Sequence, residues 1–196
     1  MTVGRIEGFS DGVVAIVITI MVLELHVPHG ITPAALVPLV HAFLAYVLSF
    51  LLGIYWNNHH HLMRTVKATG GIMWANLHLL FWLSLFPVVT AWVGGEPRAP
   101  WPAACYGAVL LAAALAWLVL ERTIIHGGGS LAQAIGRGWK ERISAAMYVV
   151  GIGLAFVHPW LADAISAGVA AARVVPDRRI VKGLSVSGST AADRSG

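Results

Sequence analysis

Long apolar segments separated by short polar connections form the main pattern of this chain. Most of these segments approach the roughly 20 residues that an α-helix needs to cross a lipid bilayer. The connections contain Gly, Pro and His residues, and Gly and Pro favour turns. The pattern therefore predicts an all-α integral membrane protein with six transmembrane helices. The predicted spans are residues 9–25, 34–55, 72–93, 102–120, 143–157 and 160–175.

The composition agrees with a membrane protein. Of the 196 residues, 58% are hydrophobic and 11% are charged, and the mean hydropathy is +0.76. These values lie outside the usual range of soluble domains. A six-span unit within residues 1–176 leaves no room for a soluble catalytic domain, so we expect no enzymatic activity. Residues 177–196 are rich in Ser, Gly and Arg, and we predict a disordered cytoplasmic tail there.

Basic residues are distributed unequally among the predicted connections. With a cytoplasmic N-terminus, twelve of the 13 Lys and Arg residues fall on the cytoplasmic side and only Arg98 falls outside. This distribution follows the positive-inside rule and predicts that both termini are cytoplasmic. The bases are scattered singly and not interleaved with aromatic residues, which argues against nucleic acid as a partner. We expect a multi-pass protein of the cell (plasma) membrane.

The first span has a face that can be followed residue by residue. At about 100° per residue, an apolar stripe with a single hydroxyl lies on one side of the predicted helix. Ser10 and Asp11 point away from this stripe, toward neighbouring helices. An aliphatic stripe of this kind faces lipid, packs against other helices or lines a pore, and periodicity alone leaves these alternatives open. The stripe consists of Phe9, Gly12, Val13, Ile16, Thr19, Ile20 and Leu23.

Asp11 is an ionisable residue near the membrane, where such a group is expected to have a partner. In the predicted topology, the end of the second span and the start of the third lie on the same side as the start of the first. The expected partners are therefore Arg5, His59, His60, Asn76 and His78. A simpler interpretation is that Ser10 and Asp11 cap the helix and that Arg5 anchors it at the interface.

An Arg-xxx-Phe-Ser-Asp element at the start of the first span is formed by Arg5, Phe9, Ser10 and Asp11. It resembles the signature of the bacterial and archaeal relatives of the endolysosomal potassium channel called transmembrane protein 175. The segments Trp56-xx-His59-His60 and Asn76-Leu77 are similar to that family as well, and the likeness covers the whole six-span layout. Two features depart from it: the sixth span is short and rich in Ala and Gly, and His61 extends the His pair to a triplet.

The resemblance implies a homotetramer whose first helices line a central pore for permeant K⁺, with no cofactor. In that family, rings of aliphatic side chains narrow the pore beside a threonine layer. Carried over to this chain, the threonine layer would be Thr19 and the rings would be Ile16, Ile20 and Leu23. Behind the pore, His and Asn partners on neighbouring spans would hold Arg5, Ser10 and Asp11. The function implied is a potassium-selective, leak-type channel.

Selectivity is not expected to come from a backbone-carbonyl filter, because the sequence contains no Thr-Val-Gly-Tyr-Gly segment. A hydrophobic constriction instead passes ions that shed part of their hydration shell, which costs less for potassium than for sodium. Thr19 hydroxyls would replace part of the lost water. Glu24, at the outer end of the same helix, is either a ring that concentrates cations or a solvated end residue.

A small proton-coupled secondary transporter is the main alternative, because ionisable groups fall within or beside the spans. These groups are Asp11, His41, His78 and Asp163. The sequence shows no inverted repeat with broken helices, which argues against a carrier. A metal site is not expected either, because adjacent histidines point in different directions on a helix and lack the i, i+4 spacing of a chelating pair. These histidines are His59, His60 and His61.

Overall fold

The computed structural model describes residues 3–26, 31–50, 59, 63, 68–126 and 139–174. Every regular element in these ranges is helical, which confirms the predicted all-α fold. The helices are α1 (Val3–Leu23), a 3-10 helix η1 (Pro33–Leu39), α2 (Val40–Phe50), α4 (Gly70–Ser84), α5 (Phe86–Gly95), α6 (Pro100–His126), α7 (Trp139–Ala155) and α8 (Pro159–Val174). The predicted tail, residues 177–196, lies outside the described residues.

Three helical segments are long and apolar enough to cross a membrane. They are α1 with 21 residues, the α4–α5 segment Gly70–Gly95 with 26 residues, and α6 with 27 residues. Val40–Phe50 and Arg142–Ala155 are shorter apolar helices. This composition identifies an integral membrane protein, while the count of six spans stays a prediction.

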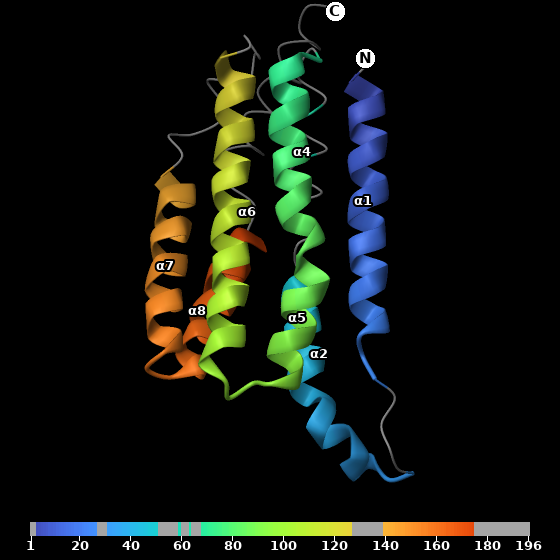
Figure 1. Ribbon diagram of the computed structural model, residues 1–196, viewed down its shortest axis with the longest axis vertical. Coiled ribbons are helices and arrows are strands. Elements are labelled where there is room, and N and C mark those ends of the chain that lie inside the picture. The colour runs from blue at the N-terminus through green and yellow to red at the C-terminus, as the bar shows by residue number, and fades with distance from the viewer. Residues whose placement is uncertain are drawn as a thin grey trace, which may run out of the picture.

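The helices run roughly parallel to one another (Figure 1). α6 is the central element and packs against α4, α5, α7 and α8. Small residues allow close approach: a Cβ added at Gly107 of α6 would lie 3.0 Å from Ile152 Cγ1 of α7. α1 lies at one side of the molecule, where it packs against α4 and α5. The first helix is therefore peripheral within a single subunit.

α1 begins at Val3, six residues before the predicted start of the first span. Ser10 and Asp11 consequently lie inside the helix, well after its first turn. The interpretation that these two residues cap the helix is therefore wrong. Their polar side chains have to be satisfied by the helix itself or by neighbouring elements.

The predicted third span is interrupted at Leu85, where α4 ends and α5 begins. Pro87 lies in the first turn of α5 and has no N–H to donate, which explains the break. Leu83 and Phe86 are buried at 5% and 0% exposure, so the break is packed in an apolar core. The predicted third span is thus formed by two helices and not by one continuous helix.

The predicted second span, residues 34–55, begins with the 3-10 helix η1, and its residues 51–55 lie outside the described residues. The remaining predicted boundaries differ mainly in length. α6 continues to His126, so Glu121, expected to begin a loop, is helical and buried. α8 occupies nearly the predicted sixth span, and the Pro159 ring sits at its first position, where a missing N–H costs nothing. α4 starts after Thr69, whose side chain accepts a hydrogen bond from the Ile72 N–H at 3.3 Å.

Candidate ion-conduction site

α1 is the least buried of the membrane-length segments. In its most apolar stretch 22% of the residues are buried, against 50% in Gly70–Gly95 and 67% in Pro100–His126. Its inner face packs on the core through Ile6, Val17 and Met21. The opposite face is an apolar surface available to lipid, to another chain or to a pore.

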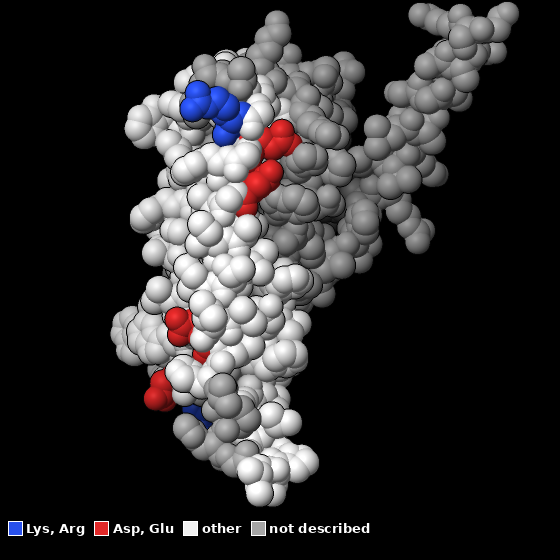
Figure 2. Space-filling model, turned by 90° about the vertical axis from the view of Figure 1, so that its right-hand side faces the viewer, with Lys and Arg blue, Asp and Glu red and all other residues white. Residues whose placement is uncertain are grey.

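The predicted pore residues all lie on this exposed face. The exposed fractions of the side chains are 59% for Ile16, 39% for Ile20 and 79% for Leu23, and Thr19 is exposed as well. Figure 2 shows the α1 side of the molecule, where charged side chains gather toward the two ends and the surface between them carries none. The structure thus places these four residues on one uncharged surface, and their role in conduction stays a prediction.

The Thr19 hydroxyl has a defined orientation. Its Oγ1 donates a hydrogen bond to the Ile16 carbonyl oxygen at 2.8 Å, within the same helix. Backbone bonding of this kind is common for Thr in membrane helices. Because the proton is used on the backbone, the oxygen presents its lone pairs outward. The exposed side of Thr19 can therefore accept a hydrogen bond or coordinate a cation.

The two ends of the exposed stripe carry different groups. Phe9, at the end nearer the N-terminus, is 54% exposed. Glu24 follows the last residue of α1 and is exposed, with its backbone N–H donating to the Ile20 carbonyl oxygen at 3.3 Å. An exposed carboxylate at one end of an apolar stripe is suitably placed to attract cations.

A buried chain of polar side chains joins α1 to its neighbours. The Asn76 Nδ2 group of α4 donates to Ser10 Oγ at 2.9 Å, and Asn76 Oδ1 lies 2.6 Å from His59 Nε2. His59 belongs to the segment between α2 and α4. Ser10 and Asn76 are each 1% exposed and His59 is 4% exposed. The resemblance described above implied that these three residues link helices, and the structure brings them together.

The hydrogen bonds of this buried polar chain all run in one direction, from donor to acceptor. An amide oxygen can only accept, so the hydrogen between Asn76 Oδ1 and His59 belongs to the histidine Nε2. Ser10 Oγ accepts from Asn76 and donates its own proton to the Ile6 carbonyl oxygen at 2.9 Å. The chain therefore runs from His59 through Asn76 to the α1 backbone, and both functional groups of the Asn76 amide are used. Asn76 is thus paired with Ser10 and His59.

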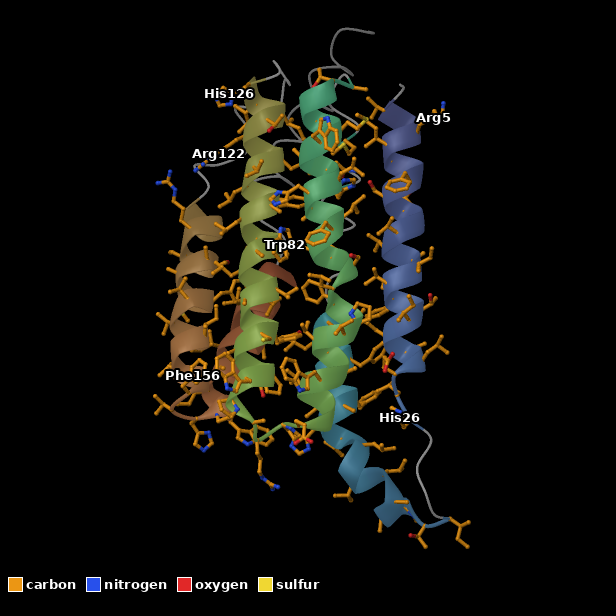
Figure 3. All side chains as sticks on the ribbon, in the orientation of Figure 1. Arg5, His26, Trp82, Arg122, His126 and Phe156 are labelled. Carbon is orange, nitrogen blue, oxygen red and sulfur yellow. The ribbon has the colours of Figure 1, made fainter. Side chains whose placement is uncertain are left out.

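The remaining motif residues are distributed differently. Arg5 is exposed and points away from the bundle (Figure 3), while Asp11 is half-buried. His78, an expected partner of Asp11, instead accepts a hydrogen bond from Trp82 Nε1 on the exposed side of α4 at 3.0 Å. His60 lies outside the described residues. Among the described residues, the motif side chains joined by hydrogen bonds are thus Ser10, His59 and Asn76.

A second polar cluster was missed by the sequence analysis. Ser49 Oγ of α2 lies 2.6 Å from Thr90 Oγ1 of α5 and 3.1 Å from Tyr106 Oη of α6. All three side chains are buried. They satisfy one another across three helices, as polar groups in hydrocarbon must. The only sequence signal was the presence of hydroxyl residues in otherwise apolar spans.

The ionisable groups considered for a carrier are not gathered at one place. His41 of α2 packs its ring against Trp160 of α8, with centroids 4.9 Å apart, and Asp163 lies one turn further along α8. His78 lies on α4 and Asp11 on α1. In the described part of the chain, no group of three His, Cys, Asp or Glu side chains is arranged to hold a metal ion.

The fold and the exposed stripe define a helical membrane protein whose first helix offers an aliphatic surface with one oxygen-presenting hydroxyl. Residues 5–87 match the family described as the endosomal/lysosomal potassium channel TMEM175. A potassium channel of Chryseobacterium sp. is 52% identical over 189 residues, covering 94% of this chain and 98% of that protein. A potassium channel of Streptomyces collinus is 36% identical over 170 residues, covering 79% and 82%.

A solved structure agrees with these sequence relatives. The crystal structure of a lysosomal potassium-selective channel TMEM175 homologue from Chamaesiphon minutus matches with a TM-score of 0.76 and 30% identity. The match covers 88% of this chain and 96% of that chain. The protein belongs to the TMEM175 family of potassium channels. The resemblance inferred from the Arg-xxx-Phe-Ser-Asp element is thereby confirmed.

Proposed function

We propose that the protein is a potassium-selective, leak-type cation channel in which the α1 helices of four copies line a central pore. The observation that carries the proposal is the aliphatic stripe of α1, which stays exposed among the described residues. A homotetramer within the bilayer brings four such stripes to one axis. Membership in a family of potassium channels supports this function, with K⁺ as the permeant ion and no cofactor.

The stripe forms the constriction of this pore. Ile16 and Leu23 are seven residues apart, which corresponds to about 10 Å along a helix. Rings of aliphatic side chains over that length exclude water when narrow and require an ion to shed part of its hydration when wider. Potassium holds its water more weakly than sodium, so it passes at lower cost. The outward lone pairs of Thr19 replace part of the lost hydration.

The charge distribution supports an orientation with both termini in the cytoplasm. Arg5 and Arg122 lie at the same end of the bundle (Figure 3), and the connection between α5 and α6, which contains Arg98, lies at the opposite end (Figure 1). This agrees with the positive-inside rule. The proposed subunit has six spans in the plasma membrane, with Glu24 at the outer mouth of the pore, where it concentrates cations.

The carrier alternative receives less support. The relatives are potassium channels by name, and the break at Leu85 is surrounded by apolar side chains such as Leu83 and Phe86. Half-helices that bind ions in transporters place polar groups at such a break. A carrier would show saturating flux coupled to protons, whereas a channel shows ohmic single-channel currents without a coupled ion.

The proposed function is tested by potassium flux from proteoliposomes that contain the purified protein, with sodium and proton gradients substituted in parallel. Ile20→Asn places an amide in the constriction and is expected to raise flux and lower the preference for potassium. Val150→Asn, on the exposed side of α7, is the matched control and should leave both unchanged. Unaltered flux and selectivity in Ile20→Asn would show that α1 does not line the pore.

A further inference from the structure

A polar pair interrupts the apolar outer surface of α4. Trp82 Nε1 donates a hydrogen bond to His78 Nε2 at 3.0 Å, and the two rings stand edge to face with centroids 6.3 Å apart. Trp82 is half-buried against the core near the α5 end of α4 (Figure 3), whereas His78 is exposed. The neighbouring exposed side chains are Trp74 at 69%, Leu77 at 36% and Phe81 at 55%.

The hydrogen bond fixes the tautomer of His78. An indole N–H can only donate, so His78 Nε2 must be the acceptor and the ring is neutral, with its hydrogen on Nδ1. His126 illustrates the usual solution for such a group, because its Nδ1 lies 2.7 Å from the Arg122 carbonyl oxygen of its own helix. None of the described residues accepts from Nδ1 of His78. An N–H donor is therefore left at the exposed surface of α4.

The depth of His78 makes this donor costly in lipid. The α4–α5 segment has 26 residues, or about 39 Å of helix against about 30 Å of hydrocarbon. His78 is eight residues from Gly70, about 12 Å along the helix, and thus roughly 7 Å inside the hydrocarbon if the segment is centred. A hydrogen bond spans about 3 Å. Water and lipid headgroups are out of its direct reach.

We propose that the α4 outer surface, formed by Trp74, Leu77, His78 and Phe81, contacts a second copy of this chain and that His78 Nδ1 donates a hydrogen bond to it. This rests on the proposed function for the presence of neighbouring copies around α1. α4 packs directly against α1, so copies that surround α1 also come beside α4. The neighbouring copy supplies the acceptor that hydrocarbon lacks.

A photo-crosslinking experiment identifies what covers this surface. Phe81 is replaced by benzoylphenylalanine in the full-length protein in bilayers, and illumination is expected to give covalent dimers. The same group at Val149, 57% exposed on α7, is the control and should give lipid adducts. Lipid adducts at Phe81 would overturn the proposal. Leu23 on α1 serves as a third labelled position. Dimers at Leu23 without dimers at Phe81 would contradict only the α4 contact. Absence of dimers at both positions would contradict the proposed tetramer as well.

Two substitutions at His78 test the hydrogen bond itself. His78→Leu removes the donor, and His78→Gln keeps an amide N–H that can replace it. Interhelical hydrogen bonds in membranes are worth about threefold each in association, so four contacts in a tetramer multiply to roughly 80-fold. We expect His78→Leu to weaken tetramer association by about that factor and His78→Gln to retain association within a few-fold. Equal association of both variants with the parent protein would refute the bond.

Discussion

Replacement of Asn76 by Leu should destabilise the protein measurably, because the Asn76 amide is the centre of the buried polar chain. The change removes its bonds to Ser10 at 2.9 Å and to His59 at 2.6 Å. His59 then keeps a buried N–H without this acceptor, which costs about 1–3 kcal/mol, and Ser10 loses an accepted bond worth about 1 kcal/mol. Ser10 retains its bond to the Ile6 carbonyl oxygen. The expected total is about 2–4 kcal/mol.

Thermal unfolding in detergent, followed by circular dichroism, measures this effect. For a chain of this length, about 2–4 kcal/mol corresponds to a fall in Tm of roughly 4–16 °C. Ser84→Ala on the same helix is the control, since among the described residues the exposed Ser84 hydroxyl bonds only to the Phe81 carbonyl oxygen of its own helix. A Tm of Asn76→Leu equal to that of the control would mean that the buried polar chain contributes nothing to holding α1 against α4.

Two further changes test the pore and the packing. Thr19→Val keeps the side-chain shape but removes the outward lone pairs. Potassium conductance is expected to fall about two- to tenfold without loss of thermal stability. Unchanged single-channel conductance would contradict a role of Thr19 in coordinating the ion. Gly94→Ala should lower Tm, because its Cβ would lie 2.8 Å from the Ala42 Cα of α2, at a cost of about 1–3 kcal/mol. Gly95→Ala is the control and should leave Tm unchanged, because no atom lies within 4 Å of its added Cβ. Equal changes in Tm for the two variants would refute the close α2–α5 contact.

The hydrophobic pattern predicted an all-helical fold and placed Ile16, Thr19, Ile20 and Leu23 on one face of α1, but it did not predict the start of that helix. Charged and glycine residues precede Phe9, and in sequence they are typical of a connection. In the structure α1 extends back to Val3, Ile6 is buried in the core, and Ser10 accepts a hydrogen bond from Asn76, 66 residues away. A contact over that sequence distance leaves no periodic signal, so the helical state of this segment depends on tertiary structure.

The sequence contains signals for both the break in the third span and the His78–Trp82 pair on α4. Pro87 lies within the predicted span, and a proline inside a helical pattern signals a break or kink. His78 and Trp82 are four residues apart, the spacing at which side chains meet on a helix. His78 was one of five expected partners of Asp11, because both residues were assigned to the same side of the membrane. Shared depth does not imply a shared helix face, and the face decides which side chains meet.

Polar groups within the spans fall into two classes: those whose hydrogen bonds are made within one subunit, and those whose hydrogen bonds are not. The His59–Asn76–Ser10 chain ends on a backbone carbonyl, and the hydroxyls of Ser49, Thr90 and Tyr106 bond to one another, so these groups hold helices of one chain together. Among the described residues, the lone pairs of Thr19 and the Nδ1 hydrogen of His78 have no hydrogen-bond partner. Hydrocarbon offers such groups no hydrogen-bond partner. In the assembly proposed above, the acceptor on α1 faces the permeant ion and the donor on α4 faces a second copy of the chain.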